Sequence, residues 1–173
     1  MKKLLLIAGI LVLSTSLMGE TRNAAEGTVN VKAKVLQPLV LKTEEVDFGI
    51  LVPGEKDKYS VKSGKINIIG APNELVQIEL KDKSGKYKKV EDFKTHYIVE
   101  LKTNGGQAQN EKMDSSLTVM ATGNGIENDI SNGYIGTDKD GKLELNVEGT
   151  VSADENQKSG DYNGVLYVRA MYR

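Results

Sequence analysis

The sequence contains no cysteine, and this absence excludes several kinds of chemistry. Without a thiol the chain can form no disulfide, use no cysteine nucleophile and offer no soft ligand to zinc. The single histidine, His96, falls inside a predicted strand, where we interpret it as an ordinary strand residue rather than a catalytic base. A serine nucleophile would need such a base, and no glycine–serine elbow is present. We therefore expect the protein not to be an enzyme.

Aromatic residues and long apolar runs are also scarce. The chain has no tryptophan, two phenylalanines and seven tyrosines, so its core must be built mainly from valine, isoleucine and leucine, which favour β-strands. Beyond residue 13 no segment approaches the roughly 20 apolar residues of a membrane helix, and we expect no membrane span. The formal net charge of −1 gives no basic excess, so we expect no nucleic-acid partner.

The first residues are typical of a secretory signal peptide. A positively charged start at residues 1–3 precedes an apolar run over residues 4–13, which is too short to span a bilayer comfortably. Cleavage fits after either Ser16 or Gly19, and we place the signal peptide at residues 1–19. Its removal, which takes away Lys2 and Lys3, lowers the formal net charge from −1 to about −3.

The clearest strand pattern covers residues 27–41. Val29, Val31, Ala33 and Val35 alternate with polar residues, so an extended backbone places all four on one face. Pro38 then interrupts the ladder because proline has no amide hydrogen to donate. We interpret residues 20–36 as an extension that donates its strand to a neighbouring copy, and residues 37–173 as the single domain that receives one. The alternative is an ordinary first strand of the same sheet.

The remainder of the chain consists of short predicted strands separated by turn residues. We expect a hairpin between two of them, 58–62 and 65–69, and long loops over 102–116 and 122–140. No segment after residue 19 has the apolar spacing of three and four that indicates a helix. This pattern predicts an all-β sandwich, with an up-and-down barrel as the alternative. The predicted strands are 45–52, 58–62, 65–69, 75–80, 87–90, 95–101, 117–121, 142–150 and 162–172.

One short acidic motif is a candidate metal site. Asp138-Lys139-Asp140-Gly141 is similar to half of a calcium-binding loop, in which alternate carboxylates converge on one ion. The full motif needs more ligands and a distal glutamate, whereas a tight turn explains the same residues without an ion. We expect neither metal nor cofactor and keep calcium binding as the alternative.

Both ends of the chain resemble one known family. The segments TVNVKAKV at residues 28–35, running into Pro38-Leu39, and GDYNGVLYVRAMY at residues 160–172 are similar to the first and last strands of chaperone–usher pilins. The motif VDFG at residues 46–49 is shared with colonisation-factor-type major pilins and with a related family of exported bacterial domains. The resemblance covers the termini and the overall length, but the polar middle of the chain does not align.

This resemblance implies a fold, a set of site residues and a set of partners. Pilin subunits are immunoglobulin-like sandwiches that lack their last strand, and the extension of the next subunit fills the resulting groove. The implied donor residues are Val29, Val31, Ala33 and Val35. The implied strand at the groove, which the chaperone would grip, carries Val165, Tyr167 and Tyr172. The implied partners are other pilin subunits, a periplasmic chaperone and an outer-membrane usher.

Two functions therefore stand as expectations. The first is a structural fimbrial subunit that is exported to the periplasm, polymerises by donor-strand exchange at the bacterial cell surface and contributes to cell adhesion. The second is a monomeric exported binding module, for example for carbohydrate, in which residues 27–35 complete their own sandwich. The low aromatic content weighs against a sugar-binding platform in the second reading.

Overall fold

The computed structural model describes residues 26–91, 95–122, 128–129 and 133–173, so the predicted signal peptide lies outside the described part. The chain divides into two units, Met1–Lys34 and Val35–Arg173. In the first unit, residues 26–34 are exposed and belong to no strand. The second unit is described below and is called the β-domain.

The β-domain is built from short antiparallel strands, as the all-β prediction requires. Its only helix within the described residues is the 3-10 turn η1, Gln109–Glu111. No described helix is long and apolar enough to cross a membrane. The strands are β1 Val40–Glu44, β2 Lys58–Tyr59, β3 Gly64–Ile69, β4 Leu75–Lys81, β5 Tyr87–Lys89, β6 Tyr97–Lys102, β7 Lys112–Thr122, β8 Asn128–Asp129, β9 Tyr134–Gly136, β10 Lys142–Val151 and β11 Tyr167–Tyr172.

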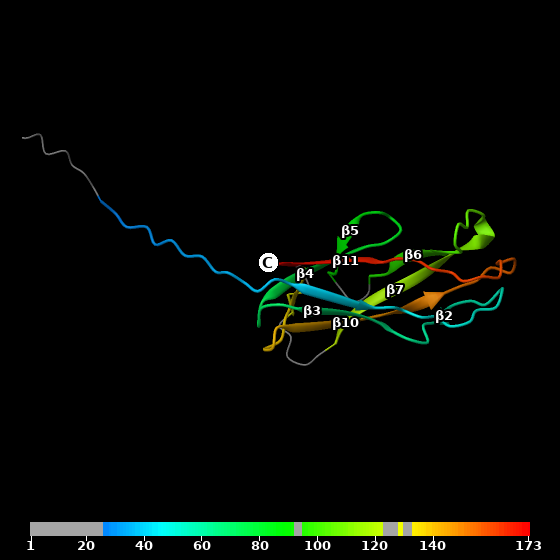
Figure 1. Ribbon diagram of the computed structural model, residues 1–173, viewed down its shortest axis with the longest axis horizontal. Helices are drawn as coiled ribbons and strands as arrows, with labels where there is room; N and C mark the ends of the chain where they lie inside the picture. The colour runs from blue at the N-terminus through cyan, green and yellow to red at the C-terminus, as the bar shows by residue number, and fades with distance from the viewer. Residues whose placement is uncertain (1–25, 92–94, 123–127, 130–132) are drawn as a thin grey trace, which may run out of the picture. The chain divides into compact units, whose positions relative to one another are not determined.

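These strands form two sheets (Figure 1). The six-stranded sheet has the order β1-β3-β10-β7-β6, with β2 paired to β10. The five-stranded sheet has the order β11-β4-β9-β8, with β5 paired to β4. Buried side chains of both sheets meet in a single core, with Ile66 and Leu145 from the first sheet and Ile78 from the second. The described strands thus form two layers rather than one closed barrel.

Strict alternation in the sequence correctly identified β10 at the centre of the six-stranded sheet. In β10, Leu143, Leu145 and Val147 are buried, and the polar residues between them lie on the opposite face. Burial of each such side chain stabilises the fold by roughly 1.5–3 kcal/mol relative to leaving it in water. The hydrophobic pattern therefore fixes which face of β10 lies against the core.

Three predictions about the middle of the chain were wrong. The expected hairpin between 58–62 and 65–69 does not form, because β2 and β3 both pair with β10. The expected loop over 122–140 contains β8 and β9. The expected loop over 102–116 includes the first part of β7, which begins at Lys112. The polar Ser115 concealed this strand: it is buried, and its hydroxyl donates to the Val99 carbonyl at 3.1 Å. A satisfied hydroxyl can thus occupy a core position.

Several expected strands are shorter than predicted or absent; the strand expected over 58–62, for example, is only Lys58–Tyr59. The strand expected over 27–41 begins only at Val40. The segment 45–52 makes a single bridge, Asp47 to Lys62, because Gly49 turns the chain at φ +68° and the Asp47 carboxylate accepts its amide. The last strand begins at Tyr167 instead of residue 162.

Candidate binding groove

The β-domain contains a groove of about 1340 Å³ that reaches down to the hydrophobic core. Its floor is the inner face of the six-stranded sheet, where the buried residues Ile66, Val99, Leu117 and Val147 line it. These four residues come from β3, β6, β7 and β10, so the floor crosses most of the sheet. These side chains are only 2–5% exposed, so the groove borders the core without laying it open to solvent.

Two irregular segments form the walls of the groove. The first wall is residues 45–53, and the second wall is residues 157–166. The Asp47–Lys62 bridge attaches the first wall to the chain leading into β3, and the Lys102–Asn163 bridge attaches the second wall to β6. Because β1 and β6 are the two end strands of the six-stranded sheet, the walls run along opposite edges of the floor. Among the described residues each wall makes one β-bridge, and side-chain hydrogen bonds add further links, from Lys58 to the Ile50 carbonyl and from Gln157 to the Lys112 carbonyl.

The walls present apolar side chains that the chain itself does not cover. Ile50 is 86% exposed and Val165 is 63% exposed, although both line the groove. Phe48 and Leu166 are partly buried against the core. Exposed apolar side chains that gather along one groove are typical of an interaction site, whereas isolated ones are normal on any surface.

The second wall lies very close to the sheet because one of its residues is glycine. A Cβ atom on Gly164 would lie 2.6 Å from the Glu100 carbonyl oxygen and 2.8 Å from a Val99 methyl group. Contacts that short do not occur in folded proteins, so any other residue here would push the wall away from β6. Gly164 therefore sets the width of the groove on this side.

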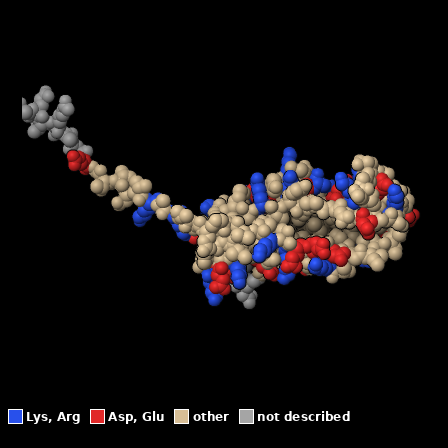
Figure 2. All heavy atoms as spheres, viewed as in Figure 1, with Lys and Arg blue, Asp and Glu red and all other residues tan. Residues whose placement is uncertain are grey.

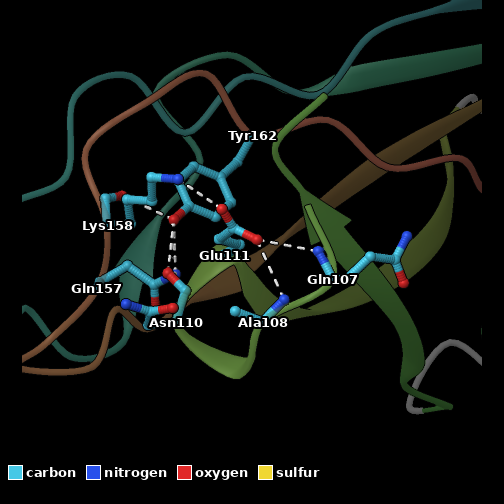
Figure 3. A network of polar contacts seen from close by, with 7 residues as sticks. All are labelled: Gln107, Ala108, Asn110, Glu111, Gln157, Lys158 and Tyr162. Atoms are coloured by element: carbon cyan, nitrogen blue, oxygen red, sulfur yellow. Dashed lines mark hydrogen bonds and ion pairs between the residues drawn. The ribbon is translucent and has the colours of Figure 1, made fainter. Parts of the chain in front are cut away.

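A polar network fixes the start of the second wall (Figure 3). The side-chain nitrogen of the buried Gln157 lies 2.8 Å from the Asn110 carbonyl and 2.8 Å from the Tyr162 hydroxyl. The Lys158 ammonium pairs with the Glu111 carboxylate. These contacts join the second wall to η1 and to the beginning of β7, so the wall has a defined position without belonging to a strand.

The charge of Glu111 depends on this network. Its carboxylate accepts from Lys158 and from the backbone amides of Ala108 and Gln107, the last two at 3.1 and 2.9 Å. These bonds stabilise the ionised form and lower the pKa of the Glu111 carboxyl from 4.5 to about 2. In turn, Glu111 raises the pKa of Lys158. The pair therefore stays charged throughout the physiological pH range.

Acidic side chains gather along one edge of a recess in the molecular surface (Figure 2). The groove lining includes Glu44 at the end of β1 and Glu45 and Asp47 of the first wall, together with Lys62 and Lys65. The Glu45 carboxylate pairs with Lys62 at 3.6 Å, and both side chains are largely exposed. This edge of the groove thus carries charges of both signs.

The predicted donor residues are exposed to solvent. Val29 is 87% exposed, Val31 is 90% exposed and Val35 is 96% exposed, and Ala33 is also exposed. Residues 26–39 belong to no strand. The alternating pattern that predicts a strand is therefore present without a sheet partner within the described chain.

The three residues predicted at the groove strand, Val165, Tyr167 and Tyr172, take different positions in the structure. Val165 lines the groove, but Tyr167 does not; Leu166 and Val168 do so instead. Side chains of β11 alternate between faces, and Tyr167 lies on the face that also carries the charged Arg169. That charge two residues away was the signal in the sequence that this face points to solvent.

Tyr172 does not line the groove; it joins the end of the β-domain to the beginning of that domain. Its hydroxyl donates to the Gln37 carbonyl at 2.7 Å and accepts from the buried Ala71 amide at 2.6 Å. The ring packs against the core from the inner face of β11. The structure thus gives Tyr172 a role in closing the β-domain rather than in lining the groove.

The acidic motif that suggested calcium forms a turn. The Asp138 carboxylate accepts from the backbone amides of Asp140 and Lys142 at 2.9 and 2.7 Å, and Gly141 adopts φ +75°. No group of three or more His, Cys, Asp or Glu residues within the described part of the chain could hold a metal ion. These bonds account for the motif without an ion.

No protein-family model matches this chain, and no curated protein matches it significantly.

Proposed function

We propose that the protein is a structural fimbrial subunit that polymerises by donor-strand exchange. In this proposal the β-domain is an immunoglobulin-like, pilin-type sandwich that lacks one strand, and the groove receives residues 27–36 of the next copy. The observation that carries the proposal is the groove itself, because it runs along the hydrophobic core between two walls that belong to no strand. The exposed valines of the extension have the composition needed to fill it.

The energetics favour insertion of such a strand. Val29, Val31 and Val35 are almost fully exposed, and burial of each in the groove would contribute roughly 1.5–3 kcal/mol. The end strand β11 has one edge that no described strand occupies, and its inward-facing Val168 lines the groove. A strand added at that edge gains main-chain hydrogen bonds as well as side-chain burial.

The alternation of the extension fits the same arrangement. With the valines directed into the groove, Lys32 and Lys34 lie on the opposite face of the extension. In a strand added at the free edge of β11 both lysines would face solvent, so no cation would be buried in the groove.

The resemblance to pilins extends the proposal to partners and location. A periplasmic chaperone would occupy the groove before assembly, an outer-membrane usher would exchange it for the next subunit, and the polymer would stand on the bacterial cell surface with a role in adhesion. The groove supports this sequence of events because the exposed apolar side chains of its walls, such as Ile50 and Val165, need a temporary cover.

A matched pair of variants tests the proposal. Val31→Lys places a charge on the face of the extension that would enter the groove, whereas Asn30→Lys places the same charge one residue away on the opposite face. Burial of an unpaired ammonium costs several kcal/mol, so we expect Val31→Lys to abolish assembly and Asn30→Lys to preserve it. The readout is the ladder of detergent-resistant multimers on a gel of unheated envelope protein.

The melting temperature of the monomer distinguishes the alternative. Donor-strand exchange predicts that Val31→Lys leaves the monomer as stable as wild type. If Val31→Lys lowers that temperature markedly and wild type forms no ladder, residues 27–35 complete their own sandwich and the chain is a monomeric binding module.

A further inference from the structure

The outer face of the five-stranded sheet carries alternating tyrosines and cations. The inward-facing residues of β4 are buried in the core. The residues between them, together with their neighbours on β5 and β11, form the outer layer of the sheet, in which Glu79 is buried and the others are at least partly exposed. Tyr167, Lys81 and Tyr87 lie side by side across the three strands. The adjacent row is Arg169, Glu79 and Lys89. We call Lys81, Tyr87, Lys89, Tyr167 and Arg169 the tyrosine–cation face.

Contacts with the rings position the cations of this face. The Lys81 ammonium lies 4.1 Å from the centroid of the Tyr167 ring and 5.3 Å from that of Tyr87. The Arg169 guanidinium lies 4.1 Å from the Tyr87 centroid. Such cation–π contacts limit the freedom of long side chains, so less conformational entropy is lost when they bind an anion.

The face has more positive than negative charge. Glu79 is the only carboxylate in the two rows; it is buried and already paired with Arg169. Lys81 and Lys89 have no carboxylate partner among the described residues. An excess of fixed cations on a chain with a net charge of −1 attracts anions to this surface rather than to the rest of the molecule.

We propose that the tyrosine–cation face binds an acidic polysaccharide that carries sulfate or carboxylate groups. The tyrosine rings are only partly exposed, at 38% for Tyr87 and 51% for Tyr167, and cations separate them. The face therefore lacks the continuous apolar centre of a protein interface and the projecting apolar side chains that enter a membrane. In an acidic polysaccharide, polar sugar rings alternate with anionic groups. This arrangement matches the alternation of tyrosines and cations on the tyrosine–cation face.

This binding site is independent of the groove. The tyrosine–cation face lies on the solvent side of the five-stranded sheet, whereas the groove opens between the sheets on the core side. Binding to the face therefore requires neither an empty groove nor a polymer. A polymer would present many copies of the face and gain avidity from them.

The test compares sulfated dextran with unmodified dextran of the same length, using the purified full chain. We expect sulfated dextran alone to bind, with an affinity that falls as salt is added. Lys81→Gln combined with Lys89→Gln should weaken binding by about tenfold, since each exposed charge contributes a modest amount. Arg169 is kept in this variant so that Glu79 retains its partner.

The control removes two exposed lysines elsewhere, Lys42→Gln with Lys139→Gln, so that the net charge is identical. This control should bind like wild type, and both variants should melt like wild type. Equal loss in the two variants, or no binding of sulfated dextran to wild type, would overturn the proposal. Equally tight binding to vesicles of anionic lipid would also overturn it, because the ligand would then be a membrane surface.

Discussion

The hydroxyl of Tyr172 is a single group that connects three segments of the β-domain. It donates to the Gln37 carbonyl and accepts from the Ala71 amide, while its own residue ends β11. The Ala71 residue is buried, so its amide cannot readily exchange this partner for water. One oxygen atom therefore joins the first residues of the domain to the last.

We predict that Tyr172→Phe destabilises the β-domain by about 1–3 kcal/mol, the cost of a buried donor without an acceptor. In a chain of this length each kcal/mol lowers the melting temperature by about 2–4 °C. Thermal unfolding followed by circular dichroism measures the shift. The control is Tyr59→Phe, whose ring is highly exposed, and which should change stability by less than about 0.5 kcal/mol. Equal melting of the two variants would show that the Tyr172 hydroxyl is unimportant.

At the scale of elements, the sequence predicted strands where alternation and burial coincide. β10 combines strict alternation with a buried face, β4 has a mixed pattern that still favours a strand, and both occur where expected. The first wall was misread because the apolar residues of 45–52 suggested a buried strand, although Ile50 and Val52 are exposed. A run of apolar residues indicates that burial of their side chains is favourable. It does not indicate whether the same chain or a second molecule buries them.

The second wall was misread for a related reason. Val165 and Leu166 continue the pattern of β11, so the strand was expected to begin at residue 162. Instead, contacts between Gln157, Tyr162 and Asn110 hold the chain out of the sheet. These contacts join residues about 50 positions apart, and a local pattern contains no information about them. The groove could therefore be expected from the resemblance to pilins, but its walls could not be derived from periodicity.

The Glu111–Lys158 pair predicts how the second wall responds to acid. Because the pKa of Glu111 is lowered from 4.5 to about 2 in the folded state, the pair contributes stability above about pH 4.5 and loses it as the pH falls through 2. We predict that Glu111→Gln melts below wild type at pH 6 and that this difference disappears near pH 2. Melting temperatures measured from pH 2 to pH 6 give the comparison.

A second acidic group with a low pKa does not disturb this measurement. Burial would raise the pKa of Asp82, but hydrogen bonds from Ser84 and Lys88 outweigh it and lower that pKa to about 2. Asp82 is the same in both proteins, so its contribution cancels. Glu155→Gln, at an exposed position of the neighbouring turn, is the control and should follow wild type at every pH. A difference between Glu111→Gln and wild type that stays constant with pH would contradict the assigned ion pair.

At the scale of the whole molecule, the β-domain has one core and an incomplete cover. The core contains buried residues from both sheets, yet four of them, including Leu117 and Val147, also line the groove. A small domain gains most of its stability from burial, so an open groove lowers the stability of the isolated subunit. A ligand that fills the groove must bind the folded state alone and must therefore raise the melting temperature.

We predict this stabilisation for a synthetic peptide of residues 27–36 added to the full-length monomer. At a peptide concentration about 100-fold above its dissociation constant, the folded state gains about 2.7 kcal/mol, which corresponds to about 5–10 °C in melting temperature. The same peptide with Val31→Lys should have no effect, because its ammonium would enter the apolar groove. With Asn30→Lys it should stabilise as wild type does, since that residue faces outward. Equal stabilisation by all three peptides would mean that they bind outside the groove, and no stabilisation by the unmodified peptide would show that the groove does not accept this strand.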